Sequence, residues 1–545
     1  MALLEVAHIS FTYPQEKEPV LQEVSFSVEE GEMIVLCGAT GCGKSTLLRL
    51  IKREISPLGN KSGRILIDGR EMDDFGERES ACLVGYVMQN PEHQIVTDRV
   101  WHEMAFGLEN LGLAQQDIAR RVAEMAAYFG IADWFDRPTA SLSGGQKQLL
   151  NLAAVMVMQP KMLILDEPTA QLDPISASEF LATIGRLHRE MGLTVLMAEH
   201  RLEEAIPLCS RLLVMERGRL IADAPPREAA AQLAGKKALL CAMPAAVRLF
   251  HALGAKGECP LDVREGRRFV REGYGNAIAS LPPEEQESER SAALAFERVS
   301  FCYSRQAQDV LRDLSFTVRE GEICAILGAN GSGKTTMLRA AAGLVRPYAG
   351  EVRVFGRRLR EYRGGSLYQG CVAMLPQDVQ SVFLCNTVQE ELEEANAAAE
   401  MLPVDLSPLM QRHPYDLSGG EQQLVALCKV LAAGPKLLLM DEPTKGVDAA
   451  AKERLAGLMR TLQAQGMTIV VVTHDVEFAA QCADRCAMFF RGGIVSQGTP
   501  RAFFGGNSFY TTAVSRMTRG HYDGAVTVED AVRLCALNGP KEGCA

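Results

Sequence analysis

Long apolar runs are missing from this sequence. Its apolar runs, such as Met33–Leu36, Met162–Leu165, Leu437–Met440 and Ile469–Val472, are short, whereas a helix that spans a bilayer needs about 18 continuous apolar residues. The first residues also lack the basic segment and the apolar core of a secretory signal. We therefore expect the 545 residues to contribute no membrane span, and the short runs to form buried parallel strands.

The sequence also lacks a basic excess and closely spaced cysteines. Its net charge of −11 and its pI near 5.5 disfavour a surface that binds nucleic acid, so we expect no nucleic-acid partner. The 15 cysteines are odd in number and form no C-x-x-C pair, which is typical of reduced thiols in a cytosol. Cys42 is interpreted as a buried space-filling residue, with a redox sensor as the alternative.

Two copies of a glycine-rich pattern are the most informative feature that is present. Gly38–Ser45 follows the pattern G-x-x-x-x-G-K-[ST], and Gly328–Thr335 repeats it 290 positions later. In this pattern the loop amides surround phosphate oxygens, the Lys reaches the outer phosphates and the hydroxyl ligates Mg²⁺. An apolar strand before each loop and a helix after it, predicted for Ser45–Ile51 and Thr335–Ala341, supply the context that the pattern requires. The chain is therefore predicted to bind a nucleoside triphosphate twice.

The repeat begins before the two loops. Ile9–Tyr13 and Val24–Val28 match Val299–Tyr303 and Leu314–Val318 at the same offset of 290. Their alternation of apolar and polar residues predicts antiparallel strands that lie over the nucleotide site.

The repeat continues after the loops with a shorter second copy. Leu142–Gln146 (Leu-Ser-Gly-Gly-Gln) pairs with Leu417–Glu421 at an offset of only 275. Gln89 precedes the first of these motifs by 53 positions, and Gln377 precedes the second by 40. The deletion therefore falls mostly in a helical insert, and the two copies are related but not interchangeable.

Acidic pairs follow an apolar strand in both copies. Asp166-Glu167 ends the run Met-Leu-Ile-Leu, and Asp441-Glu442 ends the run Leu-Leu-Leu-Met. An Asp at a strand end can hold Mg²⁺ through water. The repetition, with Pro-Thr behind each pair, favours a functional role over a surface acidic pair.

A histidine closes another apolar strand in each copy. His200 ends the run Thr-Val-Leu-Met-Ala-Glu, and His474 ends the run Thr-Ile-Val-Val-Val-Thr. Their placement at a strand end in both halves favours function over a structural role. The residue before the histidine differs, since it is Glu199 in the first copy and Thr473 in the second. The sequence offers no account of this difference.

Together, the phosphate loop, the Gln, the Leu-Ser-Gly-Gly motif, the Asp-Glu pair and the His resemble the nucleotide-binding domain of ABC ATPases. The resemblance covers nearly the whole chain, twice, and this combination of motifs is highly specific. It implies an α/β fold of two tandem P-loop NTPase domains, each with a mainly parallel core sheet, an antiparallel β subdomain and a helical subdomain. It also implies ATP and Mg²⁺ as cofactors and ATPase activity.

The repeat divides the chain into four parts: ATPase domain 1 in residues 1–230, a linker with a helical tail segment in 231–293, ATPase domain 2 in 294–505 and a C-terminal tail in 506–545. Within the linker, Leu239–Leu253 predicts a packed helix and Leu281–Ser291 a solvated tether. Leu261–Glu265 faintly resembles Val526–Asp530, and both are interpreted as small tails of their halves.

The resemblance assigns a role to each repeated residue. Glu167 and Glu442 would polarise the attacking water as general bases, and His200 and His474 would contact the γ-phosphate. The Mg²⁺ ligands would be Ser45, Gln89, Asp166, Thr335, Gln377 and Asp441. The remaining nucleotide contacts would come from Tyr13, Gly38, Gly41, Gly43, Lys44, Ser45, Thr46, Gln89, Ser143, Gly144, Gly145 and Asp173 in the first copy and from Tyr303, Gly328, Gly331, Gly333, Lys334, Thr335, Thr336, Gln377, Ser418, Gly419, Gly420 and Asp448 in the second. For the two tyrosines, a core strand position is the alternative to stacking on adenine.

In this family two halves sandwich two ATP molecules head to tail. Lys44 and Glu167 would then work opposite Ser418, and the lysine and glutamate of the second half opposite Ser143. Fused halves would form this sandwich as an intramolecular pseudo-dimer, at an effective concentration of about millimolar. Because both composite sites keep every residue of the set, we predict two active sites.

The segments after the two glutamines indicate what the ATPase drives. Asn90–Gln94 and Val100–Leu113 resemble the ATPases of energy-coupling-factor (ECF) transporters, in which Gln-Asn-Pro and Ala-Phe-Gly recur. Ser381–Leu384 and Thr387–Leu392 resemble the other ECF ATPase but lack Phe-Gly. The resemblance implies a transmembrane coupling protein and a substrate-binding membrane subunit as partners. It places the chain peripherally on the cytoplasmic face of the cell membrane, in the uptake of a vitamin, a precursor or a metal ion.

Two alternatives remain open. A tandem ABC translation factor that acts on the ribosome also joins two such domains, but it would usually carry a strongly basic linker. Residues 231–293 hold nine Lys or Arg against eight Asp or Glu, which disfavours that reading. A sugar-importer ATPase fits the segments after the glutamines less well. Packing at an ordinary helix start is the plain alternative for those segments.

Overall fold

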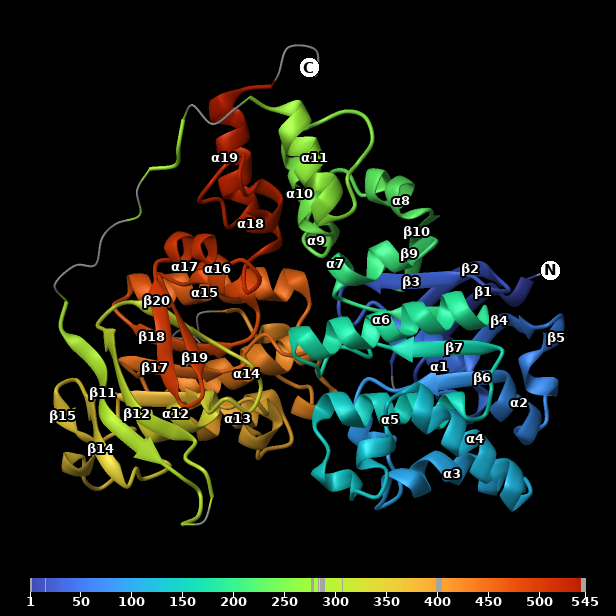
Figure 1. The fold of residues 1–545 in the computed structure, drawn as a ribbon, viewed down its shortest axis with the longest axis horizontal. Coiled ribbons are helices and arrows are strands. Elements are labelled where there is room, and N and C mark those ends of the chain that lie inside the picture. Colours follow the sequence, from blue (N-terminus) through green and yellow to red (C-terminus); the bar gives the residue numbers. More distant parts are fainter. Residues whose placement is uncertain are drawn as a thin grey trace. The chain divides into compact units, whose positions relative to one another are not determined.

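The computed structural model describes residues 2–14, 16–275, 279–282, 284, 290–305, 307–397 and 404–540. The chain divides into two compact units. Unit 1 consists of residues 1–247 and 256–262, and unit 2 of residues 248–255 and 263–545 (Figure 1). Among the described residues, no helix combines the length and the apolar character that a bilayer crossing demands. Residues 283 and 285–289 of the expected tether lie outside the described part of the chain.

Unit 1 contains two sheets. The first is antiparallel, has the strand order β2-β1-β4-β5 and confirms the strands expected around Ile9 and Val24. The second has the order β10-β9-β3-β8-β7-β6 and is parallel except for β10. The strands are β1 (Ala2–Thr12), β2 (Leu21–Glu29), β3 (Met33–Gly38), β4 (Asn60–Ile67), β5 (Arg70–Glu71), β6 (Val84–Val87), β7 (Met162–Asp166), β8 (Thr194–Ala198), β9 (Arg211–Glu216) and β10 (Arg219–Ala224).

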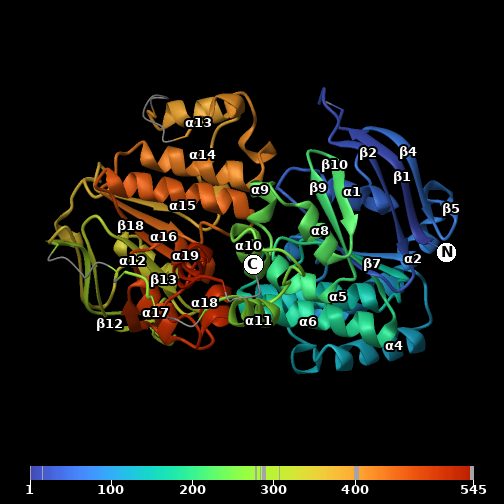
Figure 2. The same cartoon turned by 90° about the horizontal axis from the view of Figure 1, so that it is seen from above.

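The central strands of unit 1 are buried along their whole length, as expected for parallel strands covered on both faces. In Figures 1 and 2 the antiparallel strands β1, β2 and β4 lie at the opposite side of unit 1 from helix α4. The helices of this part of the chain are α1 (Lys44–Ile51), α2 (Glu77–Leu83), α3 (Val100–Asn110), α4 (Gln115–Tyr128), α5 (Gly144–Met156), α6 (Pro174–Met191), α7 (Leu202–Ala205), α8 (Pro226–Gln232), α9 (Lys237–Leu240) and α10 (Ala245–Ala252).

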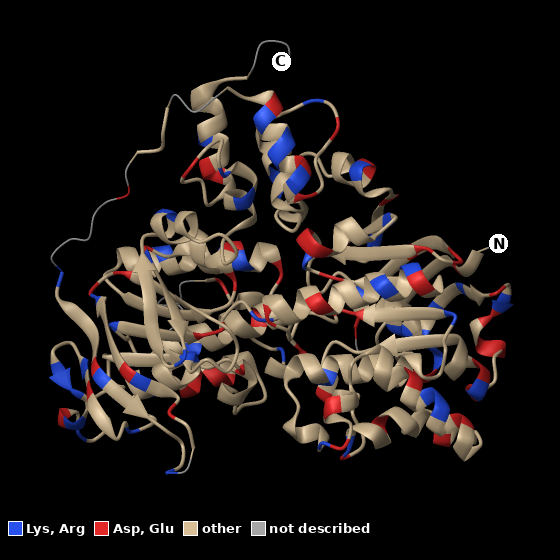
Figure 3. Ribbon diagram, in the orientation of Figure 1, with Lys and Arg blue, Asp and Glu red and all other residues tan. Residues whose placement is uncertain are grey.

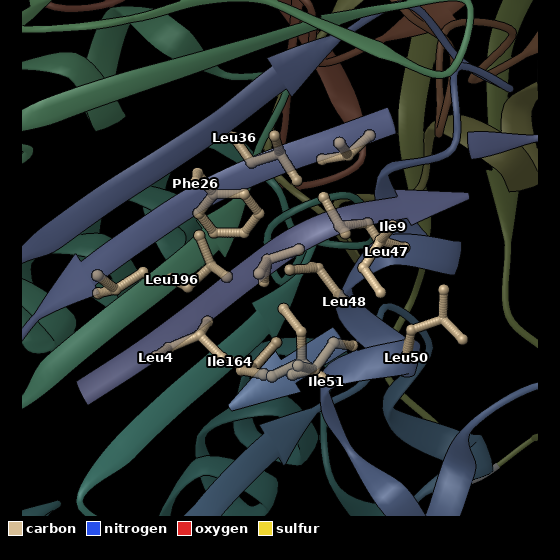
Figure 4. Close-up of a cluster of buried hydrophobic side chains, with 14 of the residues drawn as sticks. Leu4, Ile9, Phe26, Leu36, Leu47, Leu48, Leu50, Ile51, Ile164 and Leu196 are labelled. Atoms are coloured by element: carbon tan, nitrogen blue, oxygen red, sulfur yellow. The ribbon is translucent and has the colours of Figure 1, made fainter. Parts of the chain in front are cut away.

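A hydrophobic core of unit 1 lies around helix α1, which follows the phosphate loop. Figure 4 shows Leu47 and Leu48 of α1 in one cluster with Leu4 and Ile9 of the antiparallel sheet and Ile164 of the parallel sheet. Each of these five side chains is fully buried. Burial of such side chains stabilises the fold by roughly 1.5–3 kcal/mol each. Helix α1, which follows the phosphate loop, therefore packs against residues of both sheets.

Unit 2 repeats both sheets, with the orders β12-β11-β14-β15 and β16-β17-β18-β13-β19-β20. Pairs within β16-β17-β18-β13-β19 are parallel, and β20 is antiparallel. The predicted α/β fold with two tandem domains is confirmed. The strands are β11 (Ala292–Phe301), β12 (Leu311–Arg319), β13 (Ile323–Leu327), β14 (Ala349–Val354), β15 (Arg357–Arg358), β16 (Val372–Leu375), β17 (Leu437–Asp441), β18 (Thr468–Thr473), β19 (Arg485–Phe490) and β20 (Gly493–Gly498).

The helical insert of unit 2 is the shorter one. Its described residues contain α13 where unit 1 has both α3 and α4, which agrees with the deletion inferred from the two offsets. The helices of unit 2 are α11 (Val263–Gly273), α12 (Lys334–Ala341), α13 (Val388–Glu394), α14 (Gly419–Leu431), α15 (Ala449–Ala464), α16 (Val476–Cys482), α17 (Pro500–Gly506), α18 (Ala513–Thr518) and α19 (Val528–Asn538).

The two segments interpreted as tails both lead into helices, α11 and α19. Within unit 2, α11 packs against α18. The Tyr522 hydroxyl donates to the Gly275 carbonyl over 2.8 Å, and Asn538 exchanges hydrogen bonds with the backbone of Ala279. The part of the chain before the second copy is thus folded onto the part after it.

Candidate functional site

The phosphate loop of each unit requires glycine at defined positions. Gly38 has φ 154° and Gly43 has φ 101°, and a Cβ at Gly38 would lie 2.3 Å from the Met215 carbonyl oxygen. The equivalent Gly328 and Gly333 have φ 158° and 112°, with the same backbone crowding. Only glycine combines this backbone with so little space. The loop is therefore a backbone cradle in both units.

The loop lysines are buried inside their own loops. Lys44 Nζ donates to the carbonyls of Gly38 and Ala39 at 3.0 and 3.2 Å. Lys334 Nζ does the same in unit 2 at 2.8 and 2.9 Å. Both side chains are at most 5% exposed. Each loop therefore encloses a positive charge where the outer phosphates are expected to bind.

The residue after each lysine meets the aspartate at the end of a central strand. Ser45 Oγ donates to Asp166 Oδ1 over 2.8 Å, and Thr335 Oγ1 donates to Asp441 Oδ1 over 3.1 Å. Burial raises the pKa of both aspartates. A hydroxyl beside a buried carboxylate is a set of hard oxygen donors, and a divalent cation would relieve the cost of burying the charge. The residues present therefore fit Mg²⁺.

The phosphate loop of unit 2 contains a buried hydroxyl, that of Ser332. The buried Ser332 hydroxyl has no hydrogen-bond partner among the described residues. The equivalent residue of unit 1 is Cys42, which is 5% exposed and whose pKa is raised by burial. These features fit the space-filling interpretation of Cys42, because a reactive thiol needs exposure and a lowered pKa.

The glutamate after each aspartate has a strained backbone. Glu167 has φ 47° and Glu442 has φ 49°, in the left-handed region that residues other than glycine rarely adopt. The Glu167 amide donates to the Ala198 carbonyl at 3.0 Å, and the Glu442 amide donates to the Val472 carbonyl at 2.8 Å. These bonds come from the neighbouring parallel strand and hold the strained conformation. Such strain is concentrated at functional sites.

In unit 1 the Glu167 carboxylate is surrounded by three side chains. His200 Nε2 lies 2.7 Å from it, Gln89 Nε2 donates to it over 2.9 Å and Lys44 Nζ lies 3.4 Å away. Burial works to raise the pKa of Glu167, but the His200 ring and then the Lys44 ammonium outweigh it and lower the pKa to about 2. The carboxylate is thus ionised and able to accept a proton from water.

In unit 2 the Glu442 carboxylate has a different environment. His474 Nδ1 lies 2.8 Å from Glu442 Oε2 without hydrogen-bond geometry, and the His474 backbone amide donates to the same oxygen over 3.2 Å. Lys334 Nζ lies 3.9 Å away. Gln377, the counterpart of Gln89, makes no hydrogen bond to Glu442, although both residues are described.

The predicted adenine-stacking tyrosines lie beside the loops. Tyr13 OH is 3.1 Å from Thr46 Oγ1, and Tyr303 OH is 3.0 Å from Thr336 Oγ1. Tyr303 is 58% exposed. The Tyr13 ring packs against the core of unit 1, and each hydroxyl lies beside the third residue of the helix that follows the phosphate loop.

The signature and crossing-loop residues cap helices. Ser143 Oγ accepts the Gln146 amide, and the Gln146 side chain accepts the Ser143 amide, which forms a capping box at the start of α5. Ser418 and Glu421 repeat it at α14. Similar caps start α6 and α15, where the acceptors are Asp173 and Asp448. Gly144, Gly145, Gly419 and Gly420 form the first turns of α5 and α14.

None of the described hydrogen bonds joins Ser143 to the phosphate loop of its own unit. Gly41 and Gly331 are the remaining residues of the predicted set, and they have φ 78° and 73° with open space around them. Each unit thus brings the loop lysine, the glutamate and the histidine together, whereas the side-chain hydrogen bonds of Ser143 and Ser418 stay within their own helix starts.

Two polar residues of this region were not predicted from the sequence. Tyr86 OH donates to Asp166 Oδ2 over 2.9 Å, and Thr169 Oγ1 donates to Glu199 Oε2 over 2.8 Å. Tyr86 is the last residue but one of strand β6, three residues before Gln89, and this position near a strand end is the signal that could have identified it. A threonine follows the Asp-Glu-Pro run in both copies, as Thr169 and Thr444.

The segments after the two glutamines are built around one buried glutamate each. Glu103 accepts the amides of Val96 and Thr97 at 3.1 and 2.8 Å. Glu391 accepts the amides of Leu384 and Cys385 in the same way. Each carboxylate therefore fixes the turn that precedes its helix, α3 or α13.

The ABC transporter family model matches residues 21–170 and 311–445, which together include more than half of the chain. This chain belongs to the ABC transporter family. Membership implies that its two ABC domains bind and hydrolyse ATP and that it serves membrane-embedded transporter partners. An AAA domain model also matches residues 411–480, which overlap the second of these segments.

Relatives resemble the chain over nearly its whole length. A Bacillus cereus protein described as an ABC transporter ATP-binding protein is 40% identical over 98% of both chains. A Streptomyces coelicolor protein with the same description is 35% identical over 91% of this chain and 94% of its own.

Two solved structures are also similar. Archaeal ribosome recycling factor aABCE1, in complex with ribosomal stalk protein aP1, gives a TM-score of 0.58 at 20% identity over 91% of both chains, which shows a shared fold. The cbiO1 protein of Clostridium perfringens, part of the ABC transporter complex cbiONQ, is 33% identical over 42% of this chain and 91% of its own, with a TM-score of 0.39.

Proposed function

We propose that this ABC ATPase is the energy-coupling subunit of an ECF-type importer. It would couple ATP at two composite sites to the uptake of a vitamin, a precursor or a metal ion through separate membrane subunits. Its partners would be a transmembrane coupling protein and a substrate-binding membrane subunit, and it would lie peripherally on the cytoplasmic face of the membrane. The observation that carries this proposal is the apolar surface on the segment after each glutamine.

In unit 1 this surface consists of Val96, Trp101 and Phe106. Val96 is 64% exposed, and the two aromatic side chains are each 40% exposed. Large apolar side chains on a short segment, on a turn fixed by a buried carboxylate, support a protein contact, and aromatic residues are typical anchors of such contacts. The surface lies directly after Gln89, whose side chain bonds to Glu167. A partner bound there would be linked to the nucleotide site by one short segment.

The corresponding surface of unit 2 is different. Leu384 is 75% exposed, and Tyr415 is 52% exposed. Lys429 pairs with Glu391 beneath this surface, whereas the equivalent position of unit 1 is Ala154. Two unlike surfaces on one chain suit a partner that is itself asymmetric, as in the ECF systems that the sequence resembles. In Figure 3 acidic and basic residues are interspersed along both units, which supports a partner other than nucleic acid.

The proposed chemistry assigns hydrolysis to residues of this chain. Glu167 and Glu442 would accept the proton of the attacking water, and His200 and His474 would orient these carboxylates and contact the outer phosphate. Mg²⁺ bound with the nucleotide would supply charge neutralisation of the phosphates. The residues that would hold it are Ser45, Gln89 and Asp166 in unit 1 and Thr335, Gln377 and Asp441 in unit 2.

Co-expression with candidate membrane subunits from neighbouring genes tests the proposal. We expect the chain to co-purify with a membrane-embedded coupling protein, and the double variant Trp101→Ala/Phe106→Ala to lose this capture at least tenfold while ATP binding changes less than about twofold. Phe509→Ala is the matched control, because Phe509 is 96% exposed and lies outside both surfaces. Recovery of the chain with ribosomes instead of membranes would support the translation-factor alternative and contradict the proposal.

A further inference from the structure

Glu199 is a buried carboxylate that the proposed chemistry does not use. It follows strand β8 directly, precedes His200 and is 1% exposed. No ion pair of Glu199 is found among the described residues; instead three hydrogen bonds surround it. Burying a charge without a counterion is costly unless every lone pair is satisfied. The three hydrogen bonds are therefore what this buried carboxylate contributes to the site.

The three bonds join two loops of the site. Thr169 Oγ1 donates to Glu199 Oε2 over 2.8 Å, and the backbone amides of His200 and Arg201 donate to Glu199 Oε1 over 2.7 and 3.0 Å. Thr169 lies two residues after Glu167. The Arg201 guanidinium adds a bond of 2.8 Å to the Leu172 carbonyl. Glu199 therefore ties the backbone of His200 to the segment that carries the proposed base, Glu167.

Unit 2 has the same scaffold without this carboxylate. Thr444 stands where unit 1 has Thr169, but its hydroxyl lies 3.5 Å from the Thr473 hydroxyl, which accepts the Asp475 amide rather than the His474 amide. The His474 amide donates to Glu442 instead, over 3.2 Å. The amide that Glu199 binds in unit 1 is thus bound in unit 2 by the proposed base.

Whether Glu199 or the proposed base binds this amide decides which donors surround the carboxylate of the base. Because the His200 amide is bound to Glu199, the groups that contact the Glu167 carboxylate are the side chains of His200, Gln89 and Lys44. These side chains can move away from it when nucleotide and water enter. In unit 2 a backbone donor occupies Glu442 Oε2, and that donor cannot rotate away.

We propose that Glu199 is a positioning residue of unit 1, which holds the His200 backbone and frees Glu167 to act on water, so that the nucleotide held by unit 1 is hydrolysed faster than that held by unit 2. This inference rests on the proposed roles of Glu167 and His200. It makes the two sites active but unequal. The residue pair Glu199 and Thr473 is the part of the sequence that sets the difference.

The test compares Glu199→Thr, which installs the residue found in unit 2, with Glu199→Gln. Photoreactive azido-ATP labels whichever unit holds the nucleotide, orthovanadate retains the ADP formed by hydrolysis, and a protease site inserted into the linker separates the halves. For Glu199→Thr we expect trapping in unit 1 to fall about tenfold, while labelling without vanadate stays within about twofold. Glu199→Gln keeps an oxygen that accepts both amides, so we expect its trapping to stay within about twofold.

Several results would overturn the inference. Equal trapping in the two halves of the wild-type chain would contradict the unequal rates. Unchanged trapping in Glu199→Thr would remove the positioning role, and a loss of labelling together with trapping would show a merely structural residue. An equal loss in Glu199→Gln would assign the effect to charge rather than to the hydrogen bonds.

Glu167→Gln separates this inference from the proposed function. If that variant still traps ADP in unit 1, the assigned base is wrong. If it abolishes trapping there while Glu199→Thr does not reduce it, only the role of Glu199 is wrong.

Discussion

At the scale of single residues, the two glutamates with left-handed backbones are the strongest candidates for catalytic groups. Glu167 and Glu442 have φ values of 47° and 49°. Such a backbone costs of order 1–3 kcal/mol for each residue, so it persists only where the surrounding structure holds it. The backbone amide of each glutamate donates a hydrogen bond to the neighbouring strand, and each carboxylate lies close to a lysine and a histidine. Other pairs at equivalent positions, such as His8 and Arg298, also have positive φ, so it is the buried contacts of the two glutamates with a lysine and a histidine that are best explained by the chemistry that they perform.

Replacing these glutamates tests that explanation. We expect Glu167→Gln and Glu442→Gln each to reduce ATP hydrolysis, and the double variant to reduce it about 100-fold or more, because general-base catalysis contributes about 10²–10⁴ in rate. Release of inorganic phosphate at saturating ATP measures the effect. The exposed Glu30→Gln is the control. Full turnover in Glu167→Gln, with none in Glu442→Gln, would contradict the prediction of two active sites.

The lowered pKa of Glu167 also has a consequence for stability. Because its pKa falls from 4.5 to about 2 on folding, the ionised form stabilises the folded state above pH 4.5, and this stabilisation is lost as the pH falls toward 2. We therefore expect the melting temperature of the nucleotide-free wild type to exceed that of Glu167→Gln at pH 6, and the difference to shrink between pH 4.5 and the acid limit of folding. Differential scanning fluorimetry across this range checks it, and a difference independent of pH would contradict it.

The sequence predicted the site residues wherever a motif fixes the backbone, but it did not predict the hydrogen-bond partners of those residues. The sequence identified Lys44, Asp166 and Glu167 because loop and strand ends position them. It could not identify Tyr86 as a partner of Asp166, because that bond depends on β6 lying beside β7 in the sheet. The consequence of Glu199 was hidden for the same reason, since its partner Thr169 is 30 residues away.

At the scale of elements, the helix caps serve both folding and nucleotide recognition. Ser143 starts α5 with a reciprocal pair of hydrogen bonds, and its Oγ is the atom that would face an anion. The two roles can be separated by choosing the substituent. Ala removes the cap, whereas Asp keeps a good cap and adds a negative charge.

We expect Ser143→Ala to destabilise unit 1 by about 1 kcal/mol and Ser143→Asp to leave its stability nearly unchanged. Both variants are expected to lose ATP hydrolysis, since the carboxylate of Asp would repel phosphate. Urea unfolding and phosphate release provide the two readouts. A fully active Ser143→Asp variant would show that this helix start does not meet a phosphate.

The turn before α3 is a second element whose shape depends on one side chain. Glu103 is 6% exposed and accepts two backbone amides, so Glu103→Ala would leave two donors without a partner, at about 1–3 kcal/mol in stability. We expect this variant to lose capture of the membrane partner about as strongly as Trp101→Ala/Phe106→Ala does. Both amides bind a single oxygen, Glu103 Oε2, so the side-chain oxygen of Glu103→Gln can accept both, and we expect this variant to keep capture within about twofold. Undiminished capture by Glu103→Ala would show that the turn does not shape the docking surface.

At the scale of the whole molecule, the fold class and the repeat followed from the sequence because the motifs of the first copy recur in the second, at an offset of 290 up to the phosphate loop and of 275 at the Leu-Ser-Gly-Gly motif. The differences between the copies were harder to predict. The missing counterpart of α4 was visible as a change of offset, but the packing of α11 against α18 was not. That contact joins segments about 250 residues apart, and no pattern in the sequence indicated it, because the faint likeness of Leu261–Glu265 is to Val526–Asp530, which leads into α19.

The fusion of two copies leads to the last prediction, which concerns how the rate depends on concentration. Separate ATPase subunits must first associate, so their rate per chain rises with concentration, whereas a tether holds the second copy at about millimolar effective concentration. If the two copies close on each other within one chain, the rate of ATP hydrolysis per chain stays constant from nanomolar to micromolar protein. Phosphate release over this range, with the oligomeric state followed by light scattering, measures it. A rate per chain that rises in proportion to concentration would show that two chains are needed, and the proposed intramolecular pairing would then be wrong.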